Sequence, residues 1–350
     1  MENNTAFRRN SSYLDNDTVY FNMSNTTMQH ANNTVITEIN KWIAVTILFW
    51  IIVLNCTIFI LLYAKKKHSR MAFFVKNLAI ADLSVGLVYL FPEILIQRFH
   101  VGWRDETCYI FLGLKMLPIY CSTFAIVILT LDRMYVIVRP LTSATRGVKY
   151  RFGLAGSTWL LSGLLSIPYL THVTFTSTGK CIYRFTNVKA MVMSDVIINL
   201  IIPVIIMGVC YIVIISAIMR RQRNTFLVQN VQTLWQKTEK GAPGKQLITR
   251  AKIRTIKLLL IVVIAYIVCW TPTCVGVSLN VWKVIDIGPV FQMLFVLAPL
   301  NSAMNPLVFL LFNRKMFKKR QKTTFNLRTL NRAFSSTNHS TRTLLSRIDR

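Results

Sequence analysis

Long apolar runs separated by short polar or basic segments fill most of the chain. Each run is close to the roughly 20 residues that a helix needs to cross a bilayer core of about 30 Å. Backbone groups in hydrocarbon must be satisfied internally, so runs of this length favour membrane-spanning helices. The runs cover residues 42–63, 73–96, 108–138, 152–171, 191–219, 255–279 and 289–312. The pattern therefore predicts an all-α membrane protein built as a bundle of seven transmembrane helices.

Composition agrees with a membrane location, because 53% of the residues are apolar, 15% are charged and the mean hydropathy is +0.45. Lys and Arg gather after the first, third, fifth and seventh runs, in residues 65–67, 139–151, 220–257 and from 314 onward. Short basic loops stay in the cytoplasm, so these segments face inward. The net charge of +28 is thus explained by topology and by a surface that meets lipid headgroups and partners, and nucleic-acid binding is not expected.

The first 41 residues predict an extracellular tail that carries N-linked sugars. The tail is polar, and the Asn-x-Ser/Thr pattern, which only a lumenal segment can use, occurs at Asn3, Asn10, Asn16, Asn22, Asn25 and Asn32. No basic and apolar leader precedes these sites, so the first helix is expected to serve as the insertion signal. The chain is expected to cross the plasma membrane seven times, with its N-terminus outside and its C-terminus inside.

The segment after the last run predicts a short amphipathic helix over residues 313–322, which here is called helix 8, followed by a flexible cytoplasmic tail over residues 323–350. Basic residues lie on both sides of Met316 and Phe317 in the first part, and this amphipathic pattern suits a helix lying on the anionic inner leaflet. Serines and threonines among arginines in the tail predict kinase sites that recruit arrestin. A plain solvated tail is the alternative, and the sequence leaves it open.

The cysteines predict one disulfide and no zinc site. Five of the seven lie inside apolar runs, where a reduced thiol packs as a small apolar group, namely Cys56, Cys121, Cys210, Cys269 and Cys274. Cys108 lies at the outer start of the third run, and Cys181 lies in the loop after the fourth. Both are in the oxidising compartment, so a bond between them is expected.

Asp82 lies in the middle of the second run, where an unpartnered carboxylate costs several kcal/mol. Polar residues at comparable depth on other runs are Ser122, Asn301, Ser302 and Asn305. Oxygen ligands of this kind suit a small cation, and sodium is the only cofactor that the sequence suggests. A hydrogen-bonded polar core without an ion is the alternative.

Three further motifs interrupt the apolar runs. Asp132 and Arg133 form a charge pair at the inner end of the third run, and on their own they could simply mark the interface. Pro272 lies two residues after Trp270, and Pro306 follows Asn305. A proline removes a backbone hydrogen bond and bends a helix, so both motifs predict hinges. Such kinks are common in membrane helices, so neither motif is specific alone.

Taken together, the motifs resemble the rhodopsin-like family of G-protein-coupled receptors from residue 42 to about 322. The matching positions are Asn55, Leu78 to Asp82, Cys108, Asp132, Arg133, Trp159, Pro203, Tyr211, Trp270 to Pro272, Asn305 and Pro306. The resemblance implies that Arg133 is tied to Asp132 at rest and engages Tyr211 and the G-protein when the sixth helix swings outward. It also implies that Trp270 is a rotamer switch beneath the ligand and that the Asp82 cluster binds sodium.

Within this family, residues 83–93, 122–133 and 266–272 look closest to receptors for vasopressin- and oxytocin-type peptides. Receptors for neuropeptide S and for crustacean cardioactive peptide are close cousins and remain alternatives. Lys115 stands where the vasopressin and oxytocin group has a glutamine, and Asn40 stands where it uses an acid. Phe309 stands where the wider family usually has a tyrosine. The identity of the peptide is therefore open.

Charged residues near the outer ends of three runs predict the character of the ligand. Glu93, Lys115 and Asp195 lie in apolar surroundings, and with Trp270 and Cys274 they form the expected ligand site. Two acids against one base leave a negative charge that a short peptide with a positive group could satisfy. The alternative is that Lys115 neutralises one acid and that the pair only shapes the pocket.

Other classes of membrane protein fit the sequence less well. A retinal protein needs a lysine in the last run, and residues 289–312 contain none. A monoamine receptor needs an acid at the position of Lys115. The five histidines lie in tails, loops or helix mouths, so an intramembrane zinc enzyme is not expected, and no enzymatic activity is predicted. An ion-coupled transporter remains a formal alternative because Asp82 could bind an ion, although the chain shows no internal repeat.

Overall fold

The computed structural model describes residues 16–64, 69–99, 102, 104–235, 243–284 and 293–312; within these, the side chains of 16–33, 97, 98, 144, 225–235 and 243–256 are not described. Predicted helix 8 and the cytoplasmic tail lie outside the described residues, as do the sequons at Asn3 and Asn10. The side chains of the other predicted glycosylation sites, Asn16, Asn22, Asn25 and Asn32, also fall outside the description.

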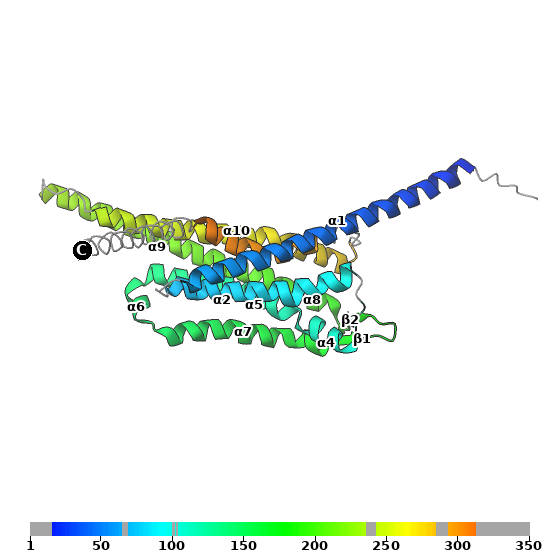
Figure 1. Cartoon of the computed structure of the whole chain (residues 1–350). Coiled ribbons are helices and arrows are strands. Elements are labelled where there is room, and N and C mark those ends of the chain that lie inside the picture. The colour runs from blue at the N-terminus through cyan, green and yellow to red at the C-terminus, as the bar shows by residue number, and fades with distance from the viewer. Residues whose placement is uncertain are drawn as a thin grey trace, which may run out of the picture.

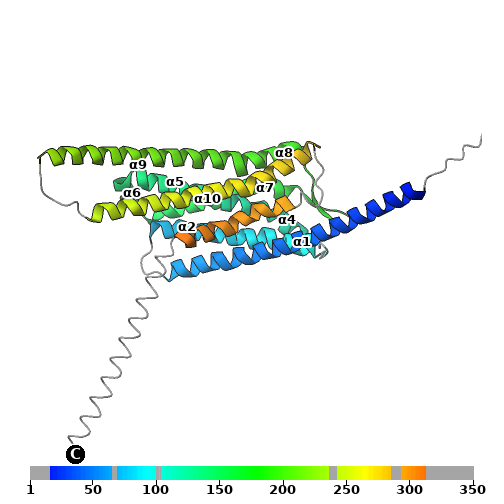
Figure 2. The same cartoon turned by 90° about the horizontal axis from the view of Figure 1, so that it is seen from above.

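The helices run side by side along one axis and form a bundle (Figures 1 and 2). A two-stranded hairpin lies at one end, which we call the hairpin end, and the short helix α6 lies at the other, which we call the α6 end. Helix α1 projects beyond the hairpin end, whereas α9 projects beyond the α6 end. The elements are α1 (Asn16–Tyr63), α2 (Arg70–Ser84), η1 (Val85–Leu90), α3 (Phe91–Glu93), η2 (Ile94–Arg98), α4 (Asp105–Leu114), α5 (Met116–Val138), α6 (Pro140–Thr145), α7 (Val148–Thr171), β1 (Val173–Phe175), β2 (Cys181–Tyr183), α8 (Val188–Val196), η3 (Ile197–Ile201), α9 (Ile202–Trp235), α10 (Pro243–Val281) and η4 (Met293–Val296).

All seven predicted apolar runs fall in helical segments wherever they are described, so the predicted bundle of seven helices is confirmed. Six described segments are long and apolar enough to cross a membrane: Thr34–Tyr63, Arg70–Ile96, Asp105–Val138, Val188–Asn224, Lys257–Val281 and Met293–Phe312. Helix α7 contains the remaining run. Apolar side chains on the outside of the bundle, such as Phe49, Ile205 and Val268, are exposed, as contact with lipid requires.

Two features of the helices differ from the simple pattern of runs. Helix α1 begins at Asn16, well before the apolar run at residue 42, and no glycine or proline interrupts the residues between. The third run is divided at Lys115, between α4 and α5. Pro118 explains this break, because it has no N–H to donate to the carbonyl of Leu114 four residues earlier.

The core consists of two clusters of buried apolar residues. The larger one includes Phe74, Ile126, Met207 and Tyr266 and joins α2, α5, α9 and α10. The smaller one contains residues of α1, η1, η2 and the last helix. Polar residues that line the cavity described below are therefore held on helices packed against each other on several sides.

The hairpin between α7 and α8 was not predicted from the sequence. Strands β1 and β2 are antiparallel and pair Val173 with Tyr183 and Phe175 with Cys181. Cys181 is bonded to Cys108 at the start of the third run, so the predicted disulfide is confirmed. The bond ties the hairpin to α4 across the mouth of the bundle.

Candidate functional site

A cavity of about 170 Å³ opens among the helices toward the hairpin end. Of the five residues predicted to bind ligand, Lys115, Asp195, Trp270 and Cys274 line this cavity. Glu93 does not line it, but lies directly behind Lys115 in a smaller pocket. The remaining lining residues are mostly apolar and include Val85, Met116, Ile119, Val192, Val196, Val277 and Pro299.

Lys115 and Glu93 form an ion pair across the second and third membrane segments. Their Nζ and Oε2 atoms are 2.7 Å apart, and both side chains are about three-quarters buried. The ammonium group also lies 5.1 Å from the ring centroid of Tyr89, where a cation–π contact adds to the pairing. Lys115 therefore neutralises one of the two acids, and that acid is Glu93.

Asp195 is held in a different way. Its two carboxylate oxygens accept hydrogen bonds from the hydroxyl groups of Tyr120 on α5 and Tyr169 on α7. No lysine or arginine among the described residues lies within ion-pair distance of it. The carboxylate thus lies at the cavity wall, fixed by neutral donors and without a cationic partner in the described part of the chain.

Aromatic side chains connect Tyr169 to the hairpin. Its ring packs edge-to-face against Tyr183 and Phe185, with centroids 5.5 Å away in each case. Burial raises the pKa of the Tyr183 phenol, which stays protonated and donates to the carbonyl of Leu112 at 2.5 Å. The disulfide and this aromatic cluster together hold the hairpin against the two tyrosines that fix Asp195.

The floor of the cavity is formed by Trp270, with Tyr266 one helical turn below it on α10. Tyr266 is fully buried and its hydroxyl donates to the backbone carbonyl of Asn199. Pro203 explains why this carbonyl is available, because it lacks the N–H that would bond to Asn199 in a regular helix. The Tyr266 hydroxyl also lies 3.3 Å from Oγ1 of Thr123. These contacts join α10 to α5 and to η3.

A second proline creates the same arrangement beside Asp82. Pro306 cannot donate to the carbonyl of Ser302, and Nδ2 of Asn55 on α1 donates to that carbonyl at 3.0 Å. Asp82 itself accepts from the Ser122 hydroxyl at 2.5 Å and from Nδ2 of Asn305 at 3.0 Å. Three of the five residues predicted for sodium are therefore in direct contact.

The other two residues predicted for sodium, Asn301 and Ser302, lie next to this cluster and, with Ser122, line the lower part of the cavity. The Oδ1 atoms of Asn301 and Asn305 are buried without a hydrogen-bond partner in the described structure. Unsatisfied buried oxygens beside a carboxylate are suitable ligands for a small cation. The oxygen atoms of these residues are therefore chemically suitable ligands for a sodium ion.

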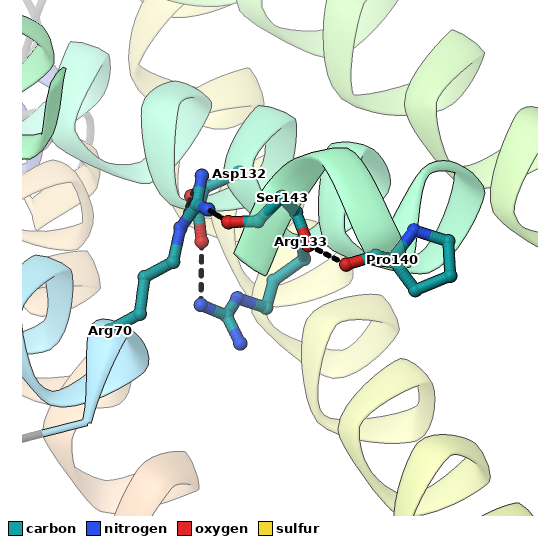
Figure 3. Close-up of polar contacts among 5 residues, drawn as sticks. All are labelled: Arg70, Asp132, Arg133, Pro140 and Ser143. Carbon is teal, nitrogen blue, oxygen red and sulfur yellow. Dashed lines mark hydrogen bonds and ion pairs between the residues drawn. The ribbon is translucent and has the colours of Figure 1, made fainter. Parts of the chain in front are cut away.

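At the α6 end, Asp132 is in contact with two arginines (Figure 3). Arg133, the next residue on α5, places Nη2 at 2.5 Å from Oδ2 of Asp132. Arg70, the first residue of α2, donates from Nε to Oδ1 at 2.6 Å. The predicted pair of Asp132 and Arg133 is therefore present, and a third partner accompanies it. Two further predicted switch residues belong to the larger core cluster or pack against it. Phe309 is buried within it, and Tyr211 packs against it.

Sequence reasoning missed Arg70, Tyr120, Tyr169 and Tyr266. Arg70 was not singled out, because it lies close to the basic segment at residues 65–67. The tyrosines lie in apolar runs where an aromatic ring usually means packing. A proline four residues after Asn199 was a usable signal for Tyr266, because it implies a carbonyl that needs another donor.

Comparison with known proteins gives a consistent result. The family described as 7 transmembrane receptor (rhodopsin family) matches residues 54–309. The chain is 32% identical over 302 residues to the mesotocin receptor of Rhinella marina, covering 81% of this chain and 76% of that protein. It is 29% identical to the oxytocin receptor of Ovis aries, over 75% of this chain and 72% of the relative. It is 26% identical to the vasopressin V1b receptor of Mus musculus, over 72% and 67% respectively.

Proposed function

The chain belongs to the rhodopsin family of seven-transmembrane receptors, and we propose that it binds a short peptide of the oxytocin and vasopressin type and signals through a heterotrimeric G-protein. The observation that carries the ligand class is the cavity at the hairpin end, whose apolar wall contains a lysine and a separate carboxylate. A peptide supplies both apolar side chains and charged or polar groups that such a site can bind.

The orientation proposed from the sequence follows the positive-inside rule. Residues 139–151, which include α6, and residues 220–257 carry many Lys and Arg residues and so face the cytoplasm. The hairpin end then faces outward, and the predicted glycosylated tail, which includes the first part of α1, lies on that side. The disulfide lies on the same side, as the oxidising compartment requires.

The ligand carries at least one positive group, and Asp195 receives it. Glu93 is already paired with Lys115, so its charge is compensated before a ligand binds. Among the described residues, Asp195 accepts from two hydroxyl groups, which leave its negative charge in place. An amine or guanidinium in this low-dielectric site would form a charge-assisted hydrogen bond with it. Lys115 can meanwhile contact a backbone carbonyl of the peptide.

Signalling follows the roles that the family resemblance assigns. Trp270 lies under the cavity and Pro272 bends α10 beside it, so a change at the ligand reaches the α10 hinge. When α10 moves outward, Arg133 leaves Asp132 and engages Tyr211 and the G-protein. A sodium ion held by Asp82, Ser122, Asn301, Ser302 and Asn305 would stabilise the resting arrangement. The segment predicted as helix 8 is amphipathic enough in sequence to bind the inner leaflet, and we propose that phosphorylation of the tail by a receptor kinase recruits arrestin.

A panel of short amidated and free peptides tests the proposal. Cells expressing the full chain are assayed for calcium and cyclic-nucleotide responses to oxytocin- and vasopressin-type peptides, neuropeptide S and crustacean cardioactive peptide. Untransfected cells give the background, and a variant with Arg133→Ala gives the matched control for coupling. A response to the first group that is lost in the variant is expected. Reconstituted protein that moves ions or solutes, with no G-protein response to any peptide, would contradict the proposal.

A further inference from the structure

Arg70 lies at the α6 end and joins three elements. Its Nε and Nη2 atoms are 2.6 and 2.5 Å from Oδ1 of Asp132, and its Nη1 donates to the carbonyl of Ser143 on α6 at 2.8 Å (Figure 3). Ser69 caps α2 just before it, with Oγ accepting from the Ala72 N–H at 3.2 Å. The cap fixes the start of α2 so that the guanidinium group points into the bundle.

The two arginines divide the carboxylate between them. Arg70 occupies Oδ1 and Arg133 occupies Oδ2, and the side chain of Asp132 is completely buried. Arg133 therefore makes one hydrogen bond instead of the two-pronged contact that arginine and carboxylate can form. Its Nε is buried without a hydrogen-bond partner in the described structure. Arg70 thus weakens the hold of Asp132 on Arg133 by taking one of the oxygens.

The surroundings offer Asp132 no other source of charge balance in the described part of the chain. Arg146 lies over the rings of Tyr135 and Tyr150, at 4.5 and 4.3 Å from their centroids. Arg221 on α9 donates to the carbonyl of Val138 at 3.1 Å. The groups that face the cluster are thus basic, aromatic or backbone, and Asp132 is the one acid that the described residues place at this end.

Departure of Arg133 would leave a buried carboxylate, and a buried charge without a partner is strongly unfavourable. We propose that Arg70 is a positioning residue that keeps the charge of the Asp132 carboxylate compensated after Arg133 leaves, and thereby lowers the cost of reaching the signalling state. The inference rests on the proposed function of Arg133 in G-protein coupling.

A stability test needs neither peptide nor G-protein. Arg133→Gln imitates departure of Arg133, and Asp132→Asn is then added in full-length protein in lipid nanodiscs. With Arg70 present, Asp132→Asn should lower the melting temperature by about 5 °C or more, because Arg70 loses the one counter-ion that the described part of the chain gives it. When Arg70→Met is also present, Asp132→Asn should raise the melting temperature, because it removes an unpaired charge. This change of sign is the expected result.

The same sign in both backgrounds would overturn the inference. If the Arg70→Met, Arg133→Gln variant is too unstable to purify as folded protein, restoration of folded protein by Asp132→Asn shows the expected stabilising effect of removing the unpaired charge. The outcome does not depend on the ligand, so a receptor that ignored every oxytocin-type peptide would disprove the proposed function without affecting this test.

Signalling gives a second test. Arg70→Met should lower agonist potency about tenfold and reduce basal nucleotide exchange. In this variant Arg133 can bind both oxygens of Asp132 at rest, and its departure then leaves the carboxylate without a cationic partner. Arg70→Lys keeps the charge and should recover most of the potency. Ser143→Ala removes the hydroxyl that donates to the Pro140 carbonyl at 2.8 Å, so it perturbs α6 without changing charge. Equal losses in Arg70→Lys and Arg70→Met, or a loss matched by Ser143→Ala, would show that Arg70 only docks α6.

Discussion

Asp195 at the hairpin end and Asp132 at the α6 end are both largely buried carboxylates that accept two partners each, but the partners differ. Two neutral tyrosine hydroxyls hold Asp195, whereas two guanidinium groups hold Asp132. The first site therefore has a surplus of negative charge and the second a surplus of positive charge. A surplus at a cavity wall suits the capture of a ligand cation, and a surplus beside Arg133 suits its release. Similar residues are thus proposed to serve binding at one end and switching at the other.

The largest expected effect comes from the covalent tie at the hairpin end. Cys108→Ala or Cys181→Ala should abolish surface expression or peptide binding, because the bond closes a loop of 73 residues and its loss costs about 4 kcal/mol. Antibody staining of intact cells and radioligand binding measure both quantities. Cys210→Ala, which alters a buried free cysteine on α9, is the matched control and should retain both. Normal binding in both single variants would contradict the prediction.

Neutralising each carboxylate should have opposite consequences. Asp195→Asn should weaken a cationic agonist about 30-fold or more, since loss of a buried charge partner costs about 2 kcal/mol or above. Asp132→Asn should instead raise basal signalling, because Arg133 loses its partner at rest. Dose-response curves and basal nucleotide exchange at matched expression give the two readouts.

The peptide supplies the control for the first of these effects. An analogue without the positive groups should be much less potent than the parent peptide on the wild type. On Asp195→Asn the two peptides should differ little in potency. Glu93→Gln is the matched receptor variant, because it removes an acid of the same charge that is already paired with Lys115. If the neutral analogue loses as much potency on Asp195→Asn as on the wild type, the peptide's charge does not meet Asp195.

The difference between the two carboxylates could be predicted from the sequence only in part. The apolar runs, the disulfide and the grouping of Asp82 with Ser122 and Asn305 followed from depth in the membrane and from the compartment. The sequence also shows two acids, Glu93 and Asp195, for the single base Lys115 near the outer ends of the helices. Which acid Lys115 neutralises depends on side-chain direction across two helices, and one linear sequence does not contain that information.

Arg70 shows the same limit at the α6 end. It is 62 positions away from Asp132 and follows a run of basic loop residues, so charge patterning does not single it out. Only the packing of α2 against α5 brings the two groups together. Tyr266 is the intermediate case, because Pro203 announces an unsatisfied carbonyl at Asn199 but not the residue that satisfies it.

Tyr266→Phe tests the hydrogen bond that joins α10 to η3 beneath the cavity. The variant leaves the Asn199 carbonyl, which Pro203 has freed, without its hydroxyl donor, and an unsatisfied buried acceptor costs about 2 kcal/mol. The melting temperature should fall by about 3 °C. Tyr63→Phe, which alters an exposed tyrosine at the end of α1, should leave it unchanged. An unaltered melting temperature in Tyr266→Phe would show that another donor replaces the hydroxyl.

The smallest expected effect concerns Phe309 on the last helix. Its ring is buried in the larger core cluster, beside a small cavity lined by Asp82, Asn305 and Pro306. A tyrosine here would place a hydroxyl where the family resemblance expects a water-mediated bridge to Tyr211 in the signalling state. One such hydrogen bond contributes about 1 kcal/mol, so Phe309→Tyr should raise basal signalling or agonist potency about fivefold. Phe312→Tyr, at the end of the same helix, controls for an added hydroxyl elsewhere. Superimposable dose-response curves for Phe309→Tyr and the wild type, at matched expression, would mean that this chain does not use the bridge.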